Sequence, residues 1–175
     1  MNKELVKEHL RAIPDFPKKG INFWDVDHLF NDPAMFRALG DELFEMYKDK
    51  GITKVVALES RGFVSGSVLA DRIGAGFVMV RKKGKLPGDC LQESYTKEYG
   101  EDTIEIHADA IKPGETVLIH DDLLATGGTM GAAYRLVKRF NPAKVYFNVI
   151  IDIVDCPRLK VFDEMIGEYD SLIEV

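Results

Sequence analysis

Two adjacent carboxylates, Asp121 and Asp122, stand between an apolar run and a glycine-rich turn. The apolar residues 117–119 predict a buried strand, and open α/β sheets bind ligands at the carboxyl ends of their strands. Gly127 and Gly128 allow positive φ and a close approach of the backbone to a ligand. Free N–H groups at the start of a following helix favour a phosphate. The stretch therefore predicts a phosphate site beside two acids.

The two acids indicate which phosphate compound would bind. A loop that held only phosphate would avoid two adjacent negative charges, whereas the neighbouring hydroxyls of a ribose offer two donors to a carboxylate pair. Thr129 is predicted to cap a helix over 130–140. The alternative is an acidic surface turn before a helix cap. We interpret the stretch as a ribose 5-phosphate site formed by Asp121, Asp122, Ala125, Thr126, Gly127, Gly128 and Thr129.

Length and composition are those of an ordinary globular chain. The 175 residues fit one domain (1–175), with 46% hydrophobic and 30% charged residues. The net charge of −6 argues against a nucleic-acid partner. No apolar run approaches the roughly 20 residues of a membrane span, so we expect a cytoplasmic protein without a membrane partner. Cys90 and Cys156 form no Cys-x-x-Cys pair, and the four histidines lack metal-ligand spacing.

Strands and helices alternate along most of the chain. Apolar runs predict strands at 54–58, 76–80, 116–120 and 144–151. Helices are predicted at 2–12, from Pro33 to about 50, at 63–73 and at 130–140. Such alternation implies an α/β fold with a mainly parallel central sheet flanked by helices.

Residues 81–107 have a different character. The first part, 81–94, is basic and contains Gly84, Pro87 and Gly88. The stretches 95–99 and 103–107 alternate like the strands of a polar hairpin. The low apolar content predicts a flexible flap that can open with little loss of stability.

Five stretches resemble motifs of the type I phosphoribosyltransferases, the purine and pyrimidine phosphoribosyltransferase family. Residues 121–129 are similar to the phosphoribosyl pyrophosphate (PRPP) motif, in the form found in the adenine-specific branch of that family. The other stretches are 16–23, 59–63, 81–88 and 95–100. The resemblance implies a small N-terminal hood over about 1–30, a flap over about 81–107, and a homodimer with sites near the subunit interface.

The resemblance also implies a reaction. Adenine and PRPP would give AMP and pyrophosphate in purine salvage, through an oxocarbenium-like transition state. Mg²⁺ would be held mainly by PRPP and water, without a dedicated set of protein ligands. The family implies pyrophosphate contacts from Ser60, Arg61, Arg81, Lys82 and Lys85, with Arg61 stabilising the leaving group. From the residues alone, an exposed turn and a solvated basic face remain open.

Glu98 is the acid/base group that the resemblance implies. It would face N7 of adenine, a task that needs a carboxyl with a raised pKa under a closed lid. Tyr99 would close over the same site. By spacing alone, Glu98 is an exposed carboxylate in a hairpin.

The adenine pocket implied by the resemblance comes from the hood and from the PRPP motif. Apolar walls are expected from Ile21, Phe23 and Leu123, and backbone groups near Asn22 and Trp24 would read the edge of the base. The alternative places Phe23 and Trp24 in the core. Asn22, Trp24 and His120 depart from the family's usual residues, and His120 is predicted to be a hydrogen-bonded core histidine.

Two alternatives stay open at the level of function. The first is a transferase for the 6-oxopurines hypoxanthine, guanine or xanthine, which a panel of bases would distinguish. The second is a PRPP-sensing regulator without catalysis. The acidic net charge and the absence of an added DNA-binding segment count against the regulator.

Overall fold

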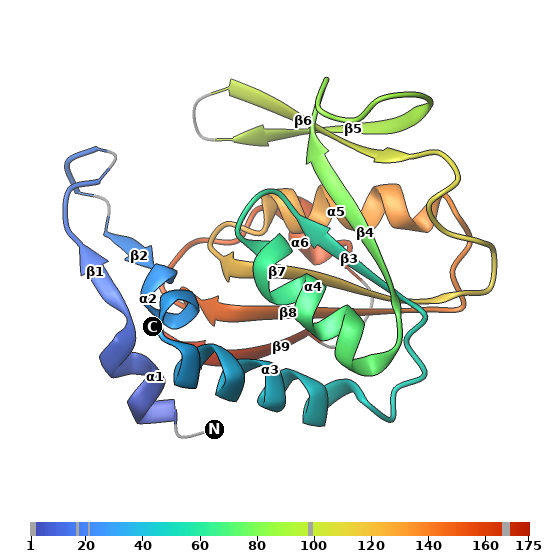
Figure 1. The fold of residues 1–175 in the computed structure, drawn as a ribbon. Helices are drawn as coiled ribbons and strands as arrows, with labels where there is room; N and C mark the ends of the chain where they lie inside the picture. Colours follow the sequence, from blue (N-terminus) through green and yellow to red (C-terminus); the bar gives the residue numbers. More distant parts are fainter. Residues whose placement is uncertain (1–2, 17, 21, 98–99, 166–168) are drawn as a thin grey trace.

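The computed structural model describes residues 3–16, 18–20, 22–97, 100–165 and 169–175. Its main sheet consists of β3 (Lys54–Leu58), β4 (Gly76–Lys82), β5 (Cys90–Lys97), β6 (Gly100–His107), β7 (Thr116–Leu124), β8 (Lys144–Asp152) and β9 (Tyr169–Glu174). The order across the sheet is β5-β6-β4-β3-β7-β8-β9 (Figure 1). The five neighbouring strands β4, β3, β7, β8 and β9 run parallel, and β6 joins the sheet antiparallel to β4. The predicted α/β fold with a mainly parallel sheet is confirmed.

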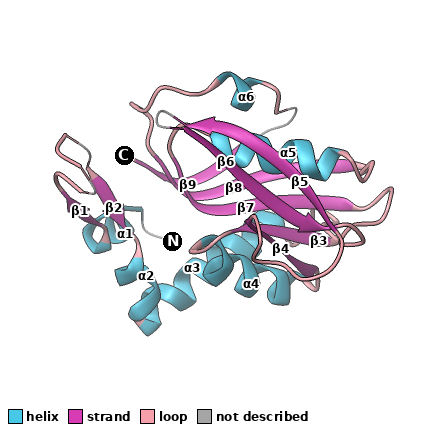
Figure 2. Ribbon diagram, turned by 90° about the horizontal axis from the view of Figure 1, so that it is seen from above, coloured by secondary structure: helices cyan, strands magenta, loops and turns pink. Residues whose placement is uncertain are grey.

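Helices cover both faces of this sheet. The helices α3 (Pro33–Tyr47) and α4 (Gly62–Ile73) lie on one face, while α5 (Gly128–Lys138) and the short α6 (Lys160–Asp163) lie on the other (Figure 2). Neighbouring strand residues point to opposite faces, so Val55 packs under the first helix pair and Val56 under α5. The candidate site lies at the carboxyl edge of the sheet, which both hydrophobic cores support. No helix in the described ranges is long and apolar enough to cross a bilayer.

The N-terminal residues form a separate small layer beside the sheet. It contains α1 (Lys3–His9), β1 (Arg11–Ile13), β2 (Phe23–Asp25) and α2 (Asp27–Asn31) (Figure 1). The helix predicted over 2–12 is wrong at its end, because Ala12 pairs with Trp24 in a two-stranded sheet. Pro14 disfavours a helical conformation in the residue before it, which suits the extended β1.

The hairpin predicted within 81–107 is confirmed and is longer than expected. β5 and β6 pair antiparallel from Cys90↔His107 to Lys97↔Gly100. The hairpin is not a purely polar flap, because Ile106 near its base, Ile104 in its middle and Tyr95 near its tip are buried against the core under α5. The described part of the hairpin is therefore packed on the core along its length.

Three further details differ from the sequence prediction. β7 continues past His120 to Leu124, because β8 offers paired partners as far as Asp152. Thr129 does not cap α5: the cap position is Gly127, with φ 78°, and no side chain caps the helix. The strand β9 and the helix α6 were not predicted.

Candidate active site

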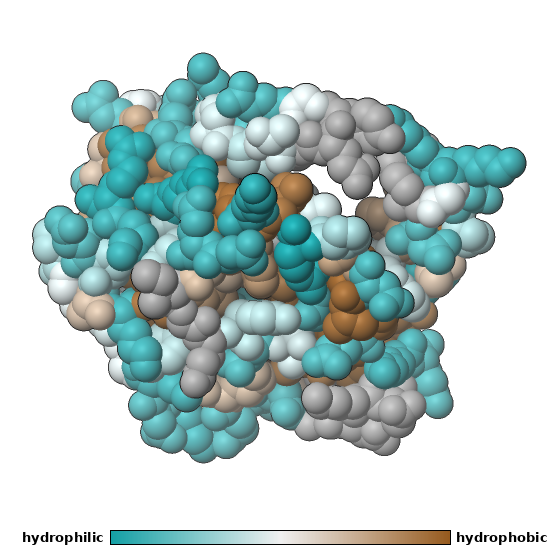
Figure 3. Space-filling model, turned by 180° about the vertical axis from the view of Figure 1, so that it is seen from behind, coloured by the Kyte–Doolittle hydropathy of each residue, from teal (hydrophilic) through white to brown (hydrophobic). Residues whose placement is uncertain are grey.

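A cavity of about 860 Å³ opens at the carboxyl edge of β3 and β7. It brings together eight of the predicted site residues: Phe23, Ser60, Arg61, Lys82, Lys85, Asp121, Asp122 and Leu123. The space-filling view from behind shows the surface hollowed between the hairpin above and the hood at one side (Figure 3). Segments about 100 residues apart in sequence thus meet in one polar cleft.

The two acids lie in the last part of β7 and face a cation. Nε of Arg61 lies 2.8 Å from Oδ2 of Asp122. Its N–H is not aligned for a hydrogen bond, and among the described residues no other group donates one to this buried oxygen. Gly62 begins α4 so close to β7 that a Cβ on it would lie 2.8 Å from Oδ1 of Asp121. A glycine is needed there for the turn to approach the acids.

Burial controls the protonation of this acid pair. Burial raises the pKa of Asp121 well above its ordinary value of 3.8, and the neighbouring charge of Asp122 raises it further. Burial also raises the pKa of Asp122, although the positive charge of Arg61 opposes this shift. Ionising these buried acids therefore costs free energy, which ribose hydroxyls or a cation would reduce.

One wall of the cavity is aromatic. The ring of Phe23 contacts Phe16 edge to face at 5.2 Å, and Cζ of Arg61 lies 5.0 Å from the Phe23 ring centroid. Leu123 lines the same cavity. Two of the three predicted apolar walls, Phe23 and Leu123, thus line one cavity, and their role in binding a base stays a prediction.

The side chains beside Phe23 do not share its orientation. Trp24 is partly buried and packs against the core under α3 and α4, as strand alternation requires. Asn22 is exposed. Neither side chain lines the cavity, so only their backbone groups remain candidates for reading a base.

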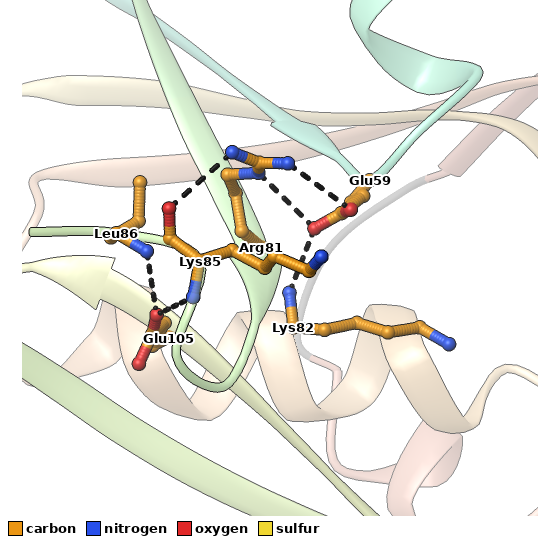
Figure 4. Close-up of polar contacts among 6 residues, drawn as sticks. All are labelled: Glu59, Arg81, Lys82, Lys85, Leu86 and Glu105. Carbon is orange, nitrogen blue, oxygen red and sulfur yellow. Dashed lines mark hydrogen bonds and ion pairs between the residues drawn. The ribbon is translucent and has the colours of Figure 1, made fainter.

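The basic segment 81–85, at the end of β4 and in the turn that follows it, is held by two glutamates (Figure 4). Glu59 accepts from Nε of Arg81 at 3.2 Å and from Nη2 at 3.3 Å, and the backbone N–H of Lys82 donates to it at 2.9 Å. Arg81 is therefore bound to a carboxylate and does not line the large cavity, whereas Lys82 and Lys85 do. Burial acts against ionisation of Glu59, but its donors lower the pKa overall.

Glu105 is the second of these glutamates. It is buried on β6 and accepts at 2.9 Å from the backbone N–H groups of both Lys85 and Leu86. Figure 4 shows this carboxylate beneath the turn that carries Lys85. Sequence reasoning missed Glu59, which follows β3, and Glu105 on β6, because a single glutamate gives no signal of its partners along the chain.

The turn 125–129 leads directly into α5. Its central residue Gly127 has positive φ, and the helix begins at Gly128. The hydroxyl of Thr129 donates to the Tyr95 hydroxyl at 2.9 Å, which links the turn to β5. Both side chains line a smaller cavity of about 220 Å³, which also reaches Asp121 and Lys82.

His120 is a core residue, as predicted. It is fully buried, with Nε2 2.7 Å from the Ser65 hydroxyl and Nδ1 2.8 Å from Oδ1 of Asn148. The Asn148 oxygen can only accept, so Nδ1 carries the proton and Nε2 accepts from Ser65. Burial lowers the pKa of His120 to about 4, although the Asn148 bond acts in the opposite direction. A neutral histidine suits this place behind the acids.

Three predicted site residues lie outside the described ranges: Ile21, Glu98 and Tyr99. Their roles stay predictions. Within the described ranges, no group of three or more His, Cys, Asp or Glu side chains is arranged to hold a metal ion.

A parallel sheet whose edge carries an acid pair, a glycine-rich turn and a basic turn is the architecture of a phosphoribosyltransferase. A family model described as "Phosphoribosyl transferase domain" matches residues 25–167. The chain belongs to this family.

The individual proteins that are similar to this chain belong to one branch of the family, the adenine phosphoribosyltransferases. An adenine phosphoribosyltransferase of Phocaeicola vulgatus is 57% identical over 164 residues, which cover 94% of each chain. A crystal structure of the adenine phosphoribosyltransferase from Thermoanaerobacter pseudethanolicus is 39% identical with a TM-score of 0.93, covering 99% of this chain and 100% of that one.

A third relative was solved with ligands. The enzyme from Saccharomyces cerevisiae, in complex with D-2,5-dideoxy-2,5-imino-altritol 1,6-bisphosphate and adenine, is 38% identical with a TM-score of 0.89. The alignment covers 98% of each chain. Two predictions are confirmed: the membership of the phosphoribosyltransferase family and the class of enzyme, which transfers a pentosyl group.

Proposed function

We propose that this protein transfers the phosphoribosyl group of PRPP to adenine and releases AMP and pyrophosphate. The observation that carries this proposal is the single cavity in which Asp121, Asp122, Arg61 and the ring of Phe23 meet. One compartment thus offers acceptors for sugar hydroxyls, a cation for a leaving polyanion and an apolar wall for a base. Complexes of the yeast relative with adenine support the choice of base.

The acids and the turn would hold the ribose phosphate. Oδ2 of Asp122 is buried without a hydrogen-bond donor among the described residues, so a ribose hydroxyl would satisfy it. The backbone N–H groups of residues 125–129 would bind the 5′-phosphate at the start of α5, and the Thr129 hydroxyl would join them after it leaves the Tyr95 hydroxyl. The pair and the turn are adjacent in sequence, as the sugar hydroxyls and the phosphate are in the ligand.

Cations around the cavity would bind the departing pyrophosphate. Arg61, with the neighbouring Ser60, stands at the end of β3, and Lys82 and Lys85 face it from the basic turn. Arg81 would contribute only after it leaves Glu59. Stabilising charge that develops on the leaving group lowers the barrier to breaking the bond at C1′.

The base would lie against Phe23 and Leu123. Glu98 would hold the proton at N7 of adenine, with Ile21 completing the apolar wall and Tyr99 closing over the site. A closed flap excludes water, which favours both the acid/base step and the stability of an oxocarbenium-like centre.

The residues of this site fit a magnesium ion that binds together with PRPP. No triad of ligands exists among the described residues, but the paired acids carry an unsatisfied buried oxygen in a cavity that also has cations for phosphate. Mg²⁺ bound to PRPP would neutralise pyrophosphate charge when present. The chain's own contribution is to orient PRPP through Asp121, Asp122 and Arg61.

A homodimer is supported by one apolar surface. The exposed side chains of Val64 on α4 and of Phe77 and Met79 on β4 are large and hydrophobic. Phe77 and Met79 lie in residues 76–80, which among the described strands pair only with β3, because β6 reaches β4 at Arg81 and Lys82. We propose that a second copy covers this surface, and that the protein acts in the cytoplasm.

A panel of bases tests the function. Pyrophosphate release from PRPP should be fast with adenine and much slower with hypoxanthine, guanine or xanthine, because a site for a 6-amino donor leaves polar groups unpaired against a 6-oxo base. Equal rates with hypoxanthine would favour the 6-oxopurine alternative. Binding of PRPP without turnover of any base would contradict the proposed activity.

A further inference from the structure

The segment that follows β8 packs on the outer side of the 5′-phosphate turn. The Arg158 guanidinium contacts the carbonyl oxygen of Ala125 and the carboxylate of Asp152, and it donates to the Ile153 carbonyl at 3.2 Å. The next residue, Leu159, donates its backbone N–H to the Thr126 carbonyl at 2.8 Å. Two consecutive carbonyls of the turn are thus held from one side.

Holding these carbonyls also orients the N–H groups of the turn. In a trans peptide the C=O and the N–H point in opposite directions. When the Ala125 carbonyl points to Arg158, the N–H of Thr126 points away from it, and the same holds for the Thr126 carbonyl and the N–H of Gly127. The donors proposed for the phosphate are therefore turned away from the segment 158–162.

Close packing shows that this segment is seated on the turn. A Cβ on Gly127 would lie 2.5 Å from Cδ2 of Phe162, and one on Gly131 would lie 2.7 Å from the Val161 carbonyl oxygen. The helix α6, which contains Val161 and Phe162, lies beside α5 (Figure 2). The outer side of the turn is covered by protein, so a phosphate must approach from the opposite side.

The charge of Arg158 is matched by a buried partner. Asp152 is 2% exposed and accepts from the Tyr169 hydroxyl at 2.9 Å, besides its contact with Arg158. A planar guanidinium can serve a carboxylate and two carbonyls at once, which the single ammonium of a lysine does less well. Arg158 therefore ties the end of β8 to the phosphate turn.

We propose that Arg158 is a positioning residue for binding of the 5′-phosphate of the substrate, acting through the Ala125 carbonyl without touching the ligand. This inference rests on the proposed function. It assigns the affinity for a ribose 5-phosphate monoester partly to a side chain outside the PRPP motif, on the segment between β8 and α6.

The test compares two variants with a matched control. Arg158→Lys keeps the charge, and the double variant Arg158→Met with Asp152→Asn removes both partners without leaving a buried charge. The control is Arg135→Met, because Arg135 binds Glu164 just after α6 and contacts no carbonyl of the turn. Circular dichroism and thermal unfolding verify that each variant is folded.

In both Arg158 variants the dissociation constant for AMP, measured by calorimetry, and the KM for PRPP should rise. We expect about 10- to 100-fold in the double variant, the factor for loss of a charge-assisted hydrogen bond, and a smaller rise in the lysine variant. The KM for adenine and the kcat at saturating PRPP should change little. The Arg135 control should bind AMP normally.

Two outcomes would overturn the assignment. AMP affinity in the double variant equal to that of the unaltered protein would show that the turn does not need Arg158. An equal loss of affinity for AMP and adenine, or the same loss in the Arg135 control, would show general loosening of the fold. Failure of the unaltered protein to bind AMP at all would instead contradict the proposed function.

Discussion

Arg61 stands between the acid pair and the aromatic wall, with Nε 2.8 Å from Oδ2 of Asp122 and Cζ 5.0 Å from the centre of the Phe23 ring. This cation offsets part of the unfavourable free energy of the buried negative charge at Asp122. A bound ribose would take over that task through its hydroxyls. In the proposed reaction Arg61 would then be released toward the pyrophosphate, and substrate binding and leaving-group stabilisation would be coupled through one side chain.

The ribose site can be tested with Asp122→Asn. This change replaces a charged acceptor by an amide that is a weaker acceptor and partly a donor, so PRPP affinity should fall about 10- to 100-fold. Binding of adenine should change much less. Calorimetric titration with PRPP measures the effect, and unchanged PRPP affinity in a folded variant would dismiss the assignment.

The raised pKa of Asp121 predicts a gain of stability from Asp121→Asn in the empty protein. A carboxyl whose folded pKa lies above 3.8 favours folding while protonated, and this contribution is lost as the pH rises through the folded pKa. The asparagine variant should therefore melt at a higher temperature than the unaltered protein at neutral pH. The difference should shrink toward pH 4, below which both side chains are uncharged.

The same variant should lose PRPP affinity, which separates stability from function. Thermal unfolding followed over a pH series, with and without PRPP, measures both effects. A variant that is less stable than the unaltered protein at neutral pH would show that the charge of Asp121 is well compensated in the empty site.

Glu98→Gln tests the predicted acid/base residue. If Glu98 handles the proton at the base nitrogen, kcat should fall about 10²- to 10⁴-fold while PRPP affinity stays nearly the same. The exposed Glu101 on β6 supplies a matched control, because Glu101→Gln removes a hairpin charge without an assigned role. A near-normal single-turnover rate would reduce Glu98 to a residue of the flap.

Phe23→Leu tests the wall of the base pocket. Loss of the flat aromatic contact should raise the KM for adenine about 3- to 10-fold and spare PRPP binding. Trp24, the only tryptophan, packs toward the core, so Trp24→Phe should leave the KM for adenine nearly unchanged. Steady-state kinetics measure both values, and a larger effect from Trp24 than from Phe23 would contradict this placement.

The sequence by itself determined the local pattern around the site. The strand at 54–58 was predicted with its observed bounds, because the four apolar residues 55–58 lie between a turn at Gly51 and the polar residues 59–61. Asp32 and Pro33 marked the start of α3, where the Asp32 carboxylate accepts from two backbone N–H groups. The hydrophobic periodicity, the helix-capping residues and the order of acids, glycines and helix in the motif depend on neighbouring residues. They can therefore be read directly from the sequence.

Partners far apart in sequence were decided only by the tertiary structure. Thr129 looked like a helix cap, yet its hydroxyl bonds Tyr95 on the hairpin, 34 residues away. Arg81 looked like a free cation, yet Glu59 holds it at the end of the neighbouring strand. A side chain's partner depends on which segments the sheet order brings together, and spacing along the chain carries no such information.

The C-terminal segment shows the same limit most clearly. No local pattern in residues 158–162 points to a phosphate, yet this stretch packs over Gly127 and holds the carbonyls of the turn through Arg158. The contact exists because β8 ends beside β7, at the register Leu124↔Asp152, and returns the chain across the turn. The motif 121–129 identifies the groups proposed to bind a ribose phosphate. The packing around the motif decides where those groups point.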